Sequence, residues 1–236
     1  MESASPASSD FRRPQALLFD AYGTLFDVYS VAQLAEQLFP GYGQALSVLW
    51  RDKQIEYTRL VTTSNHGAHY QPFWELTRAA LVYALKKLTI QSFSAAHIDQ
   101  LMNQYHHLTA YPENREVLLA LKAKGVATGI LSNGNREMLA MAVKSAGLGD
   151  VLDHVISVDS VRKYKTHPAA YALGEVACGL PAAQIAFVSS NSWDALAATW
   201  YGYPTLWVNR HNAPFEELGT QPTRVGTSLR DVLSFF

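Results

Sequence analysis

Cysteine is almost missing from this sequence, since Cys178 is the only one among 236 residues. A disulfide within the chain is therefore impossible, and such usage suits a reducing compartment such as the cytoplasm. The sequence also lacks an apolar run approaching the ~20 residues that a membrane-spanning helix needs. A formal net charge of -1 gives no reason to expect nucleic acid or an anionic membrane as a partner. We expect a soluble cytoplasmic protein.

The order of apolar patterns along the chain predicts a core with an insertion. Residues 1–13 are small, polar and proline-containing, without the apolar centre of a signal peptide, which predicts a loose tail. After a predicted strand at 15–20, four amphipathic helical patterns follow, and helices then alternate with short apolar runs. This order predicts a doubly wound, Rossmann-like α/β core with a parallel sheet, built from residues 14–27 and 110–236. A helical-bundle cap is predicted over residues 28–109.

Polar side chains follow four of the predicted strands. They are Asp20 after "ALLF", Ser132 and Asn133 in "GILSNGN", Lys165 beyond "VIS", and Ser189, Asn191 and Asp194 in "IAFVSSNSWD". Because parallel strands end at one edge of a sheet, these side chains are expected to converge there. Taken singly, a Ser-Asn pair is typical of a turn or helix cap, and a lysine of a solvated surface. Two acids and a lysine at one predicted edge favour a functional site.

The motifs also resemble those of a known family. "FDAYGTL", "LSNGN", Lys165 ahead of "PAAY", and "SSNSWD" resemble, in this order, the four motifs of the haloacid dehalogenase superfamily. The likeness extends to the forms used by its L-2-haloacid dehalogenases, and "LWRDKQIEYT" resembles their cap helix that contributes an arginine, here Arg51. The resemblance implies hydrolytic dehalogenation of short-chain L-2-haloacids to D-2-hydroxy acids by a homodimer without metal or cofactor.

What the resemblance implies for single residues centres on Asp20. It would attack the carbon that carries the halogen, forming an ester that water then hydrolyses. Lys165 would keep Asp20 ionised, and Asp194 with Asn191 would position or deprotonate the water. The other implied assignments are Thr24 and Ser189 in the charged network, Arg51 and Asn191 for the halide, Ser132 with neighbouring backbone N–H groups for the substrate carboxylate, and Asn133, Tyr22, Phe73, Tyr171 and Trp193 as further substrate-binding residues.

Tyr22 distinguishes this sequence from the phosphatases of the superfamily. In those enzymes a second acid stands at this position and protonates the departing alkoxide, and Mg²⁺ neutralises the phosphoryl group. A halide leaves as an anion and needs no proton, so Tyr22 favours carbon–halogen cleavage. A magnesium-dependent phosphatase or phosphonatase, and a non-catalytic binding protein with this fold, stay open as alternatives. Between "EYT" and "FW" the chain carries a few residues more than the family pattern, which leaves the substrate size open.

Overall fold

A single six-stranded sheet forms the centre of the computed structural model, which describes residues 13–236. The strand order is β3-β2-β1-β4-β5-β6, and every neighbouring pair is parallel. The predicted doubly wound α/β fold is confirmed, whereas the predicted tail lies outside the described residues except for residue 13. The strands are β1 (Ala16–Phe19), β2 (Ala127–Ser132), β3 (His154–Ser157), β4 (Ile185–Ser189), β5 (Thr205–Val208) and β6 (Arg224–Gly226).

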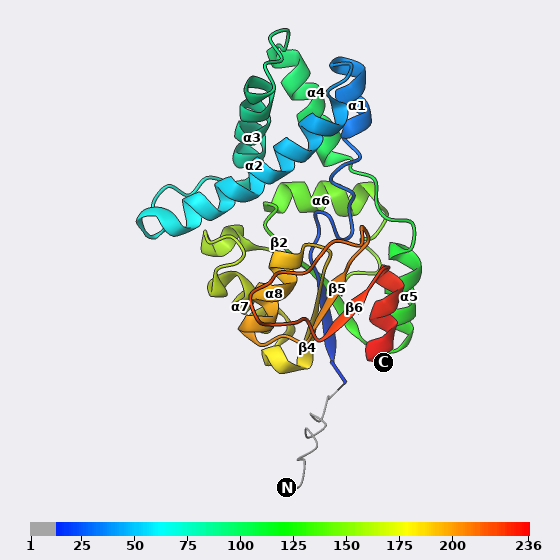
Figure 1. Cartoon of the computed structure of the whole chain (residues 1–236). Helices are drawn as coiled ribbons and strands as arrows, with labels where there is room; N and C mark the ends of the chain where they lie inside the picture. The colour runs from blue at the N-terminus through cyan, green and yellow to red at the C-terminus, as the bar shows by residue number, and fades with distance from the viewer. Residues whose placement is uncertain (1–12) are drawn as a thin grey trace, which may run out of the picture.

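Helices cover both faces of this sheet, which is why its central strands are so apolar. All four residues of β1 are fully buried. α5 and η4 lie on one face, and α7 and α8 lie on the other (Figure 1). β6 and η4 were not predicted, because β6 has three residues and only one of them is apolar. The elements outside the cap are α5 (Asn114–Ala123), α6 (Arg136–Ser145), α7 (Pro168–Cys178), α8 (Ser192–Tyr201), and the 3-10 helices η2 (Val158–Val161), η3 (Ala182–Gln184) and η4 (Leu229–Phe235).

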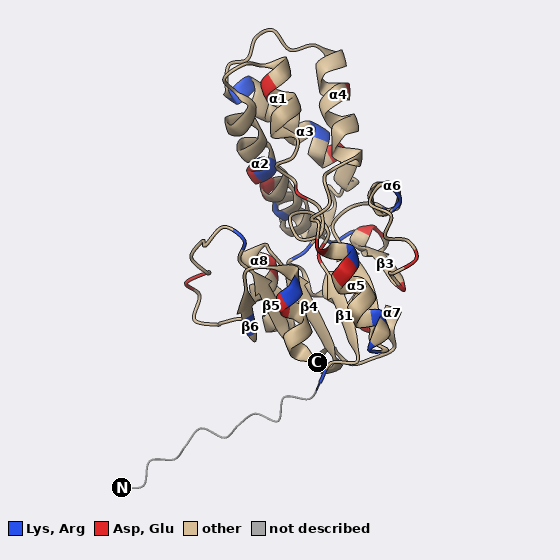
Figure 2. Cartoon of the chain, turned by 90° about the vertical axis from the view of Figure 1, so that its right-hand side faces the viewer, with Lys and Arg blue, Asp and Glu red and all other residues tan. Residues whose placement is uncertain are grey.

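Four helices between β1 and β2 form a separate bundle above the sheet (Figure 2). The chain enters and leaves this bundle through adjacent segments, since Asp27 N donates to Thr109 O at 2.8 Å and Phe26 forms a β-bridge with Ala110. We propose that residues 28–109 form the cap domain on a core of residues 14–27 and 110–236. The bundle holds α1 (Ala32–Leu38), α2 (Gly43–Thr63), the 3-10 helix η1 (Ser64–Gly67), α3 (Phe73–Lys87) and α4 (Ala95–His106).

α2 buries only part of the apolar pattern that predicts it. The spacing of Leu46, Leu49, Trp50, Lys53, Tyr57 and Leu60 predicts an amphipathic helix here, yet Leu60 is 48% exposed. Leu46 and Trp50 do face inward, but most of their buried neighbours are polar. These polar side chains have hydrogen-bond partners both at the edge of the sheet and within the bundle, since Arg51 donates to Tyr22 O and Gln54 donates to Thr77 Oγ1. The buried polar residues of α2 are Ser47, Arg51, Gln54, Thr58 and Thr62.

Ser94 caps α4, because its hydroxyl accepts a hydrogen bond from His97 N. Positive and negative side chains are interspersed over the bundle and the sheet region (Figure 2), in keeping with the net charge of -1. Between residues 13 and 236, no helix has the length and apolar content needed to span a membrane.

Candidate active site

Asp20 directly follows the central strand and lies at the carboxyl edge of the sheet. Its Oδ1 accepts a hydrogen bond from Lys165 Nζ at 3.1 Å. Its Oδ2 accepts from Asn191 Nδ2 at 2.8 Å and from Thr24 Oγ1 at 3.1 Å. Only 6% of Asp20 is exposed, so fixed donors, rather than bulk water, solvate its charge. A carboxylate held in this way is oriented before any substrate arrives.

Lys165 lies between two carboxylates. Its Nζ is 2.9 Å from Asp194 Oδ2 as well as 3.1 Å from Asp20 Oδ1. Lys165 is 1% exposed and Asp194 is fully buried. The backbone N–H of Lys165 donates to Asn133 Oδ1 at 2.9 Å, which fixes the loop before α7 to the end of β2. Because a buried charge is stable only when paired, this single ammonium stabilises both carboxylates.

The turn from β4 into α8 supplies a second group of polar contacts. Ser190 N donates to Thr24 Oγ1 at 2.8 Å, and that hydroxyl in turn donates to Asp20. Asn191 N donates to Ser189 Oγ at 3.1 Å, which shapes the turn. β1 and β4 are neighbours although β2 and β3 intervene in sequence, and such a switch in strand order is where open α/β sheets bind ligands.

Arg51 reaches this edge from α2 in the bundle. Its guanidinium donates to Tyr22 O at 3.0 Å, to Asn191 Oδ1 at 3.3 Å and to Gln54 Oε1 at 2.7 Å. All three acceptors are neutral, and within residues 13–236 no carboxylate lies at ion-pair distance from Arg51. Arg51 is only 8% exposed. A buried cation without a protein anion is a preformed site for an anionic ligand.

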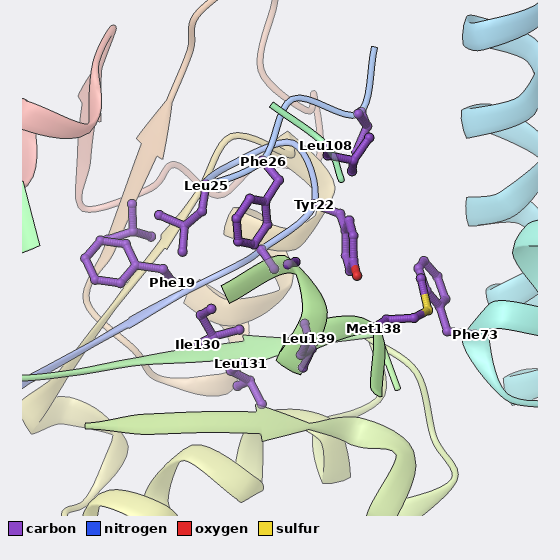
Figure 3. Close-up of a cluster of buried hydrophobic side chains, with 14 of the residues drawn as sticks. Phe19, Tyr22, Leu25, Phe26, Phe73, Leu108, Ile130, Leu131, Met138 and Leu139 are labelled. Carbon is purple, nitrogen blue, oxygen red and sulfur yellow. The ribbon is translucent and has the colours of Figure 1, made fainter. Parts of the chain in front are cut away.

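A small pocket opens beside Asp20 between the bundle and the sheet. Tyr22 forms part of its apolar wall, with its ring 5.7 Å from Phe73 and stacked at 5.5 Å on Tyr105, and Figure 3 shows Tyr22 reaching toward Phe73. Burial raises the pKa of the Tyr22 hydroxyl well above its ordinary value, and this neutral, buried hydroxyl has no partner among the described residues. The pocket is lined by Asp20, Tyr22, Arg51, Ile55, Thr58, Phe73, Ser132, Asn133 and Trp193.

The chain also matches a known family of hydrolases over most of its length. The family model described as haloacid dehalogenase-like hydrolase matches residues 14–202. The chain belongs to the haloacid dehalogenase-like hydrolases. The membership predicted from the motifs around Asp20, Ser132, Lys165 and Asn191 is thereby confirmed.

Relatives of this hydrolase come from several bacteria. An (S)-2-haloacid dehalogenase of Pseudomonas putida is 41% identical, over 89% of this chain and 92% of its own. One from Pseudomonas sp. strain YL is 41% identical, over 94% of both chains. A crystal structure of an L-2-haloacid dehalogenase is 56% identical with a TM-score of 0.92, covering 95% of this chain and 99% of its own. The enzyme from Xanthobacter autotrophicus with chloropropionic acid covalently bound is 36% identical with a TM-score of 0.85, covering 93% and 96%.

Six predicted site residues of the hydrolase do not line this pocket: Thr24, Lys165, Ser189, Asn191, Asp194 and Tyr171. Tyr171 is 1% exposed and does not line the pocket, and its assignment to substrate binding stays a prediction. Its hydroxyl donates to Asp194 Oδ1 at 2.7 Å instead, because α7 turns this side chain toward α8. Asp194 does not line the pocket either and reaches Asp20 through Lys165. A role for Asp194 as the base that deprotonates water stays a prediction.

The Tyr171 hydroxyl gives a prediction about pH. Burial raises the pKa of Asp194, while Lys165 and the Tyr171 hydroxyl oppose that rise. Tyr171→Phe removes a hydrogen bond to the charged form, so the pKa of Asp194 rises further. Asp194 is then protonated at higher pH, and the acid limb of the kcat profile is expected to move toward neutral pH. Tyr201→Phe, which removes a hydroxyl bonded to Glu175, is the matched control. An acid limb of the kcat profile at the same pH in Tyr171→Phe as in wild type would contradict the effect of Tyr171 on Asp194.

Three residues near the site were not predicted. Thr58 lines the pocket, and Gln54 and Tyr105 form hydrogen bonds behind Arg51. The signal for Gln54 and Thr58 was present, since they lie three and seven positions after Arg51, on the same side of a helix. Tyr105 comes from α4, and no local pattern relates it to α2.

The segment between α2 and α3 joins the bundle to the loop that carries Lys165. Tyr70 stacks on Tyr164 at 5.3 Å and its hydroxyl donates to Asp159. Tyr164 OH donates to Gln71 O at 2.6 Å, and Tyr164 N donates to Thr62 Oγ1 at 3.1 Å. The sequence marked this segment only as longer than the family pattern. Tyr70 and Gln71 of this segment, together with Thr62 of α2, thus connect the bundle to the loop beside the pocket.

Proposed function

We propose that this protein hydrolyses short-chain L-2-haloacids to D-2-hydroxy acids. The observation that carries the proposal is the pairing of an oriented carboxylate, Asp20, with an uncompensated cation, Arg51, in one pocket. The first provides a nucleophile, and the second provides a place for the halide that it displaces. Tyr22 stands in the position of a phosphatase's second acid, and because burial raises the pKa of its hydroxyl it is a much weaker proton donor than a carboxylic acid. The relatives named above are (S)-2-haloacid and L-2-haloacid dehalogenases.

The proposed reaction has two covalent steps. An Asp20 oxygen attacks the carbon bearing the halogen from the side opposite to it, a carbon–oxygen bond forms, and halide departs with the bonding electrons. Configuration at that carbon inverts. Water then adds to the carboxyl carbon of Asp20 and the ester bond to that carbon breaks. One proton of the water goes to the departing oxygen, the other is released to solvent, and the hydroxy acid departs with the inverted configuration. The Asp20 carboxylate is regenerated for the next cycle.

Each neighbouring group has a proposed part in these steps. Lys165 pairs with the Asp20 carboxylate, and Asn191 and Thr24 orient it for attack, as their contacts with it support. Ser189 maintains the turn that carries Asn191. The proposed substrate contacts are Arg51 and Asn191 for the halide, Ser132 and Asn133 for the substrate carboxylate, and Tyr22, Phe73 and Trp193 for the alkyl group.

The test is halide release from each enantiomer of 2-chloropropionate in excess EDTA. We expect release from the L enantiomer alone, with D-lactate as the product, because displacement by Asp20 inverts the reacting carbon once. Turnover of phosphate esters on addition of Mg²⁺, with no halide released, would support the phosphatase alternative. Inactivity toward both substrate classes would support a binding protein with this fold.

A homodimer in the cytoplasm completes the proposal. Apolar side chains on the outer surface of the bundle support self-association, among them Val48 at 37%, Leu60 at 48% and Tyr83 at 37% exposure. The single cysteine supports a reducing compartment. Sedimentation analysis is expected to give twice the chain mass of 26.1 kDa. A monomer at micromolar concentration would contradict the assembly.

A further inference from the structure

Gln54 lies one helical turn after Arg51 on α2 and is fully buried. Its Oε1 accepts a hydrogen bond from Arg51 Nη1 at 2.7 Å and another from Tyr105 OH at 3.2 Å. Its Nε2 donates to Thr77 Oγ1 on α3 at 2.6 Å. One amide therefore joins α2, α3 and α4 directly behind the guanidinium.

The orientation of this amide follows from counting protons. The Thr77 hydroxyl has one proton, which it donates to Phe73 O at 2.7 Å, so it can only accept from Gln54. The Nε2 group of Gln54 must consequently face Thr77, and Oε1 must face Arg51. Both lone pairs of Oε1 are then occupied. Trp50 Nε1 donates to Thr77 O at 2.8 Å and holds the same turn of α3 in place.

The neutrality of Gln54 matters as much as its geometry. Glutamate has the same size and could accept the same hydrogen bond from Arg51, but it would form a buried ion pair. Since no described carboxylate pairs with Arg51, the attraction of its charge remains available to an anion in the pocket. A glutamate at position 54 would neutralise the positive charge of Arg51 and so weaken its attraction for an anion in the pocket.

We propose that Gln54 is a positioning residue that holds Arg51 against the pocket as an uncompensated cation and so sets the affinity for the departing halide. Gln54 does not line the pocket and acts through Arg51 alone. The inference rests on the proposed function, because the halide is the product of that reaction. Gln54 supplies a hydrogen bond without a charge, and Thr77 and Tyr105 prevent it from turning away.

The test measures halide binding without turnover. Chloride binding is followed by ³⁵Cl NMR line broadening and competed with bromide, using wild type, Gln54→Glu, Gln54→Met and Thr77→Val. We expect about tenfold weaker bromide binding in Gln54→Glu, where the charge of Arg51 is neutralised. About threefold weakening is expected in Gln54→Met and Thr77→Val, which loosen the guanidinium but leave its charge. Gln44→Glu, on the exposed side of α2, is the matched control and is expected to match wild type.

Kinetics give a second readout that a merely structural role would not move. In single turnovers, Gln54→Glu is expected to slow displacement of chloride more than that of bromide, because the poorer leaving group depends more on halide stabilisation. Bromide binding by Gln54→Glu equal to that of Gln44→Glu would overturn the proposal, as would a wild type that binds no bromide. Because the NMR measurement needs no haloacid, a failure to dehalogenate would contradict the proposed function separately. If Gln54→Glu does not fold, Thr77→Val provides the test, and bromide binding equal to that of wild type would overturn the proposal.

Discussion

Asp20→Asn is expected to abolish halide release from L-2-chloropropionate, with a loss of about four orders of magnitude or more. An amide is a very poor nucleophile, and among the described residues Asp20 is the only acid that lines the pocket. Lys165, Asn191 and Thr24 would still surround position 20. The variant should therefore bind the substrate but not react with it. Halide release measured by ion chromatography tests this expectation.

A covalent role for Asp20 also predicts where oxygen from water goes. With excess enzyme in H₂¹⁸O, the first turnover should leave ¹⁸O on Asp20 and unlabelled oxygen in the hydroxy acid, since water attacks the carboxyl carbon. Mass spectrometry of the peptide that contains Asp20 locates the label. Asp99→Asn, which breaks an exposed ion pair with Arg78, is the matched control and should retain activity. Label in the product of the first turnover would indicate direct attack by water.

Lys165→Met is expected to have the second largest effect, on both activity and stability. It leaves the Asp20 and Asp194 carboxylates buried without the ammonium that bonds to both. Removing one partner of a buried pair costs about 3–5 kcal/mol in the free energy of unfolding. A loss of activity of about 10³-fold or more should accompany it, because Lys165 orients Asp20. Urea unfolding and steady-state kinetics measure the two effects.

The destabilisation by Lys165→Met should depend on pH in a definite direction. Burial already raises the pKa of Asp194, and loss of the opposing attraction of Lys165 raises it further. A buried acid whose pKa is higher in the folded than in the unfolded protein destabilises the fold once the pH rises above its unfolded-state pKa. The difference in free energy of unfolding between wild type and Lys165→Met should therefore become smaller as the pH is lowered toward the ordinary pKa of aspartate. Lys86→Met, at an exposed position of α3, should show no such trend.

Sequence predicted the part of the site that the sheet organises. Asp20, Ser132 and Ser189 follow or end three adjacent parallel strands, so their convergence follows from topology alone. Lys165 could be expected nearby because it follows the next strand, β3. No long-range packing needs to be known for these placements.

The part of the site that depends on helix packing could not be predicted in the same way. Whether Tyr171 faces the pocket or Asp194 depends on how α7 rotates against α8, and the apolar pattern of α7 leaves that rotation open. Gln54 and Tyr105 are 51 positions apart and meet only because α2 and α4 pack together. β6 could not be predicted for a different reason, since three residues are too few to show the alternating pattern of a strand.

The backbone contact between Asp27 and Thr109 has a consequence for how such a protein can change. Because the two ends of the bundle lie side by side, the bundle does not displace β1 or α5, the elements that precede and follow it. Bundles of other lengths could replace the present one between residues 27 and 109 without moving Asp20. The nucleophile and the halide site thus come from separate stretches of the chain, and a graft at residues 27 and 109 would replace Arg51 while leaving Asp20 in place.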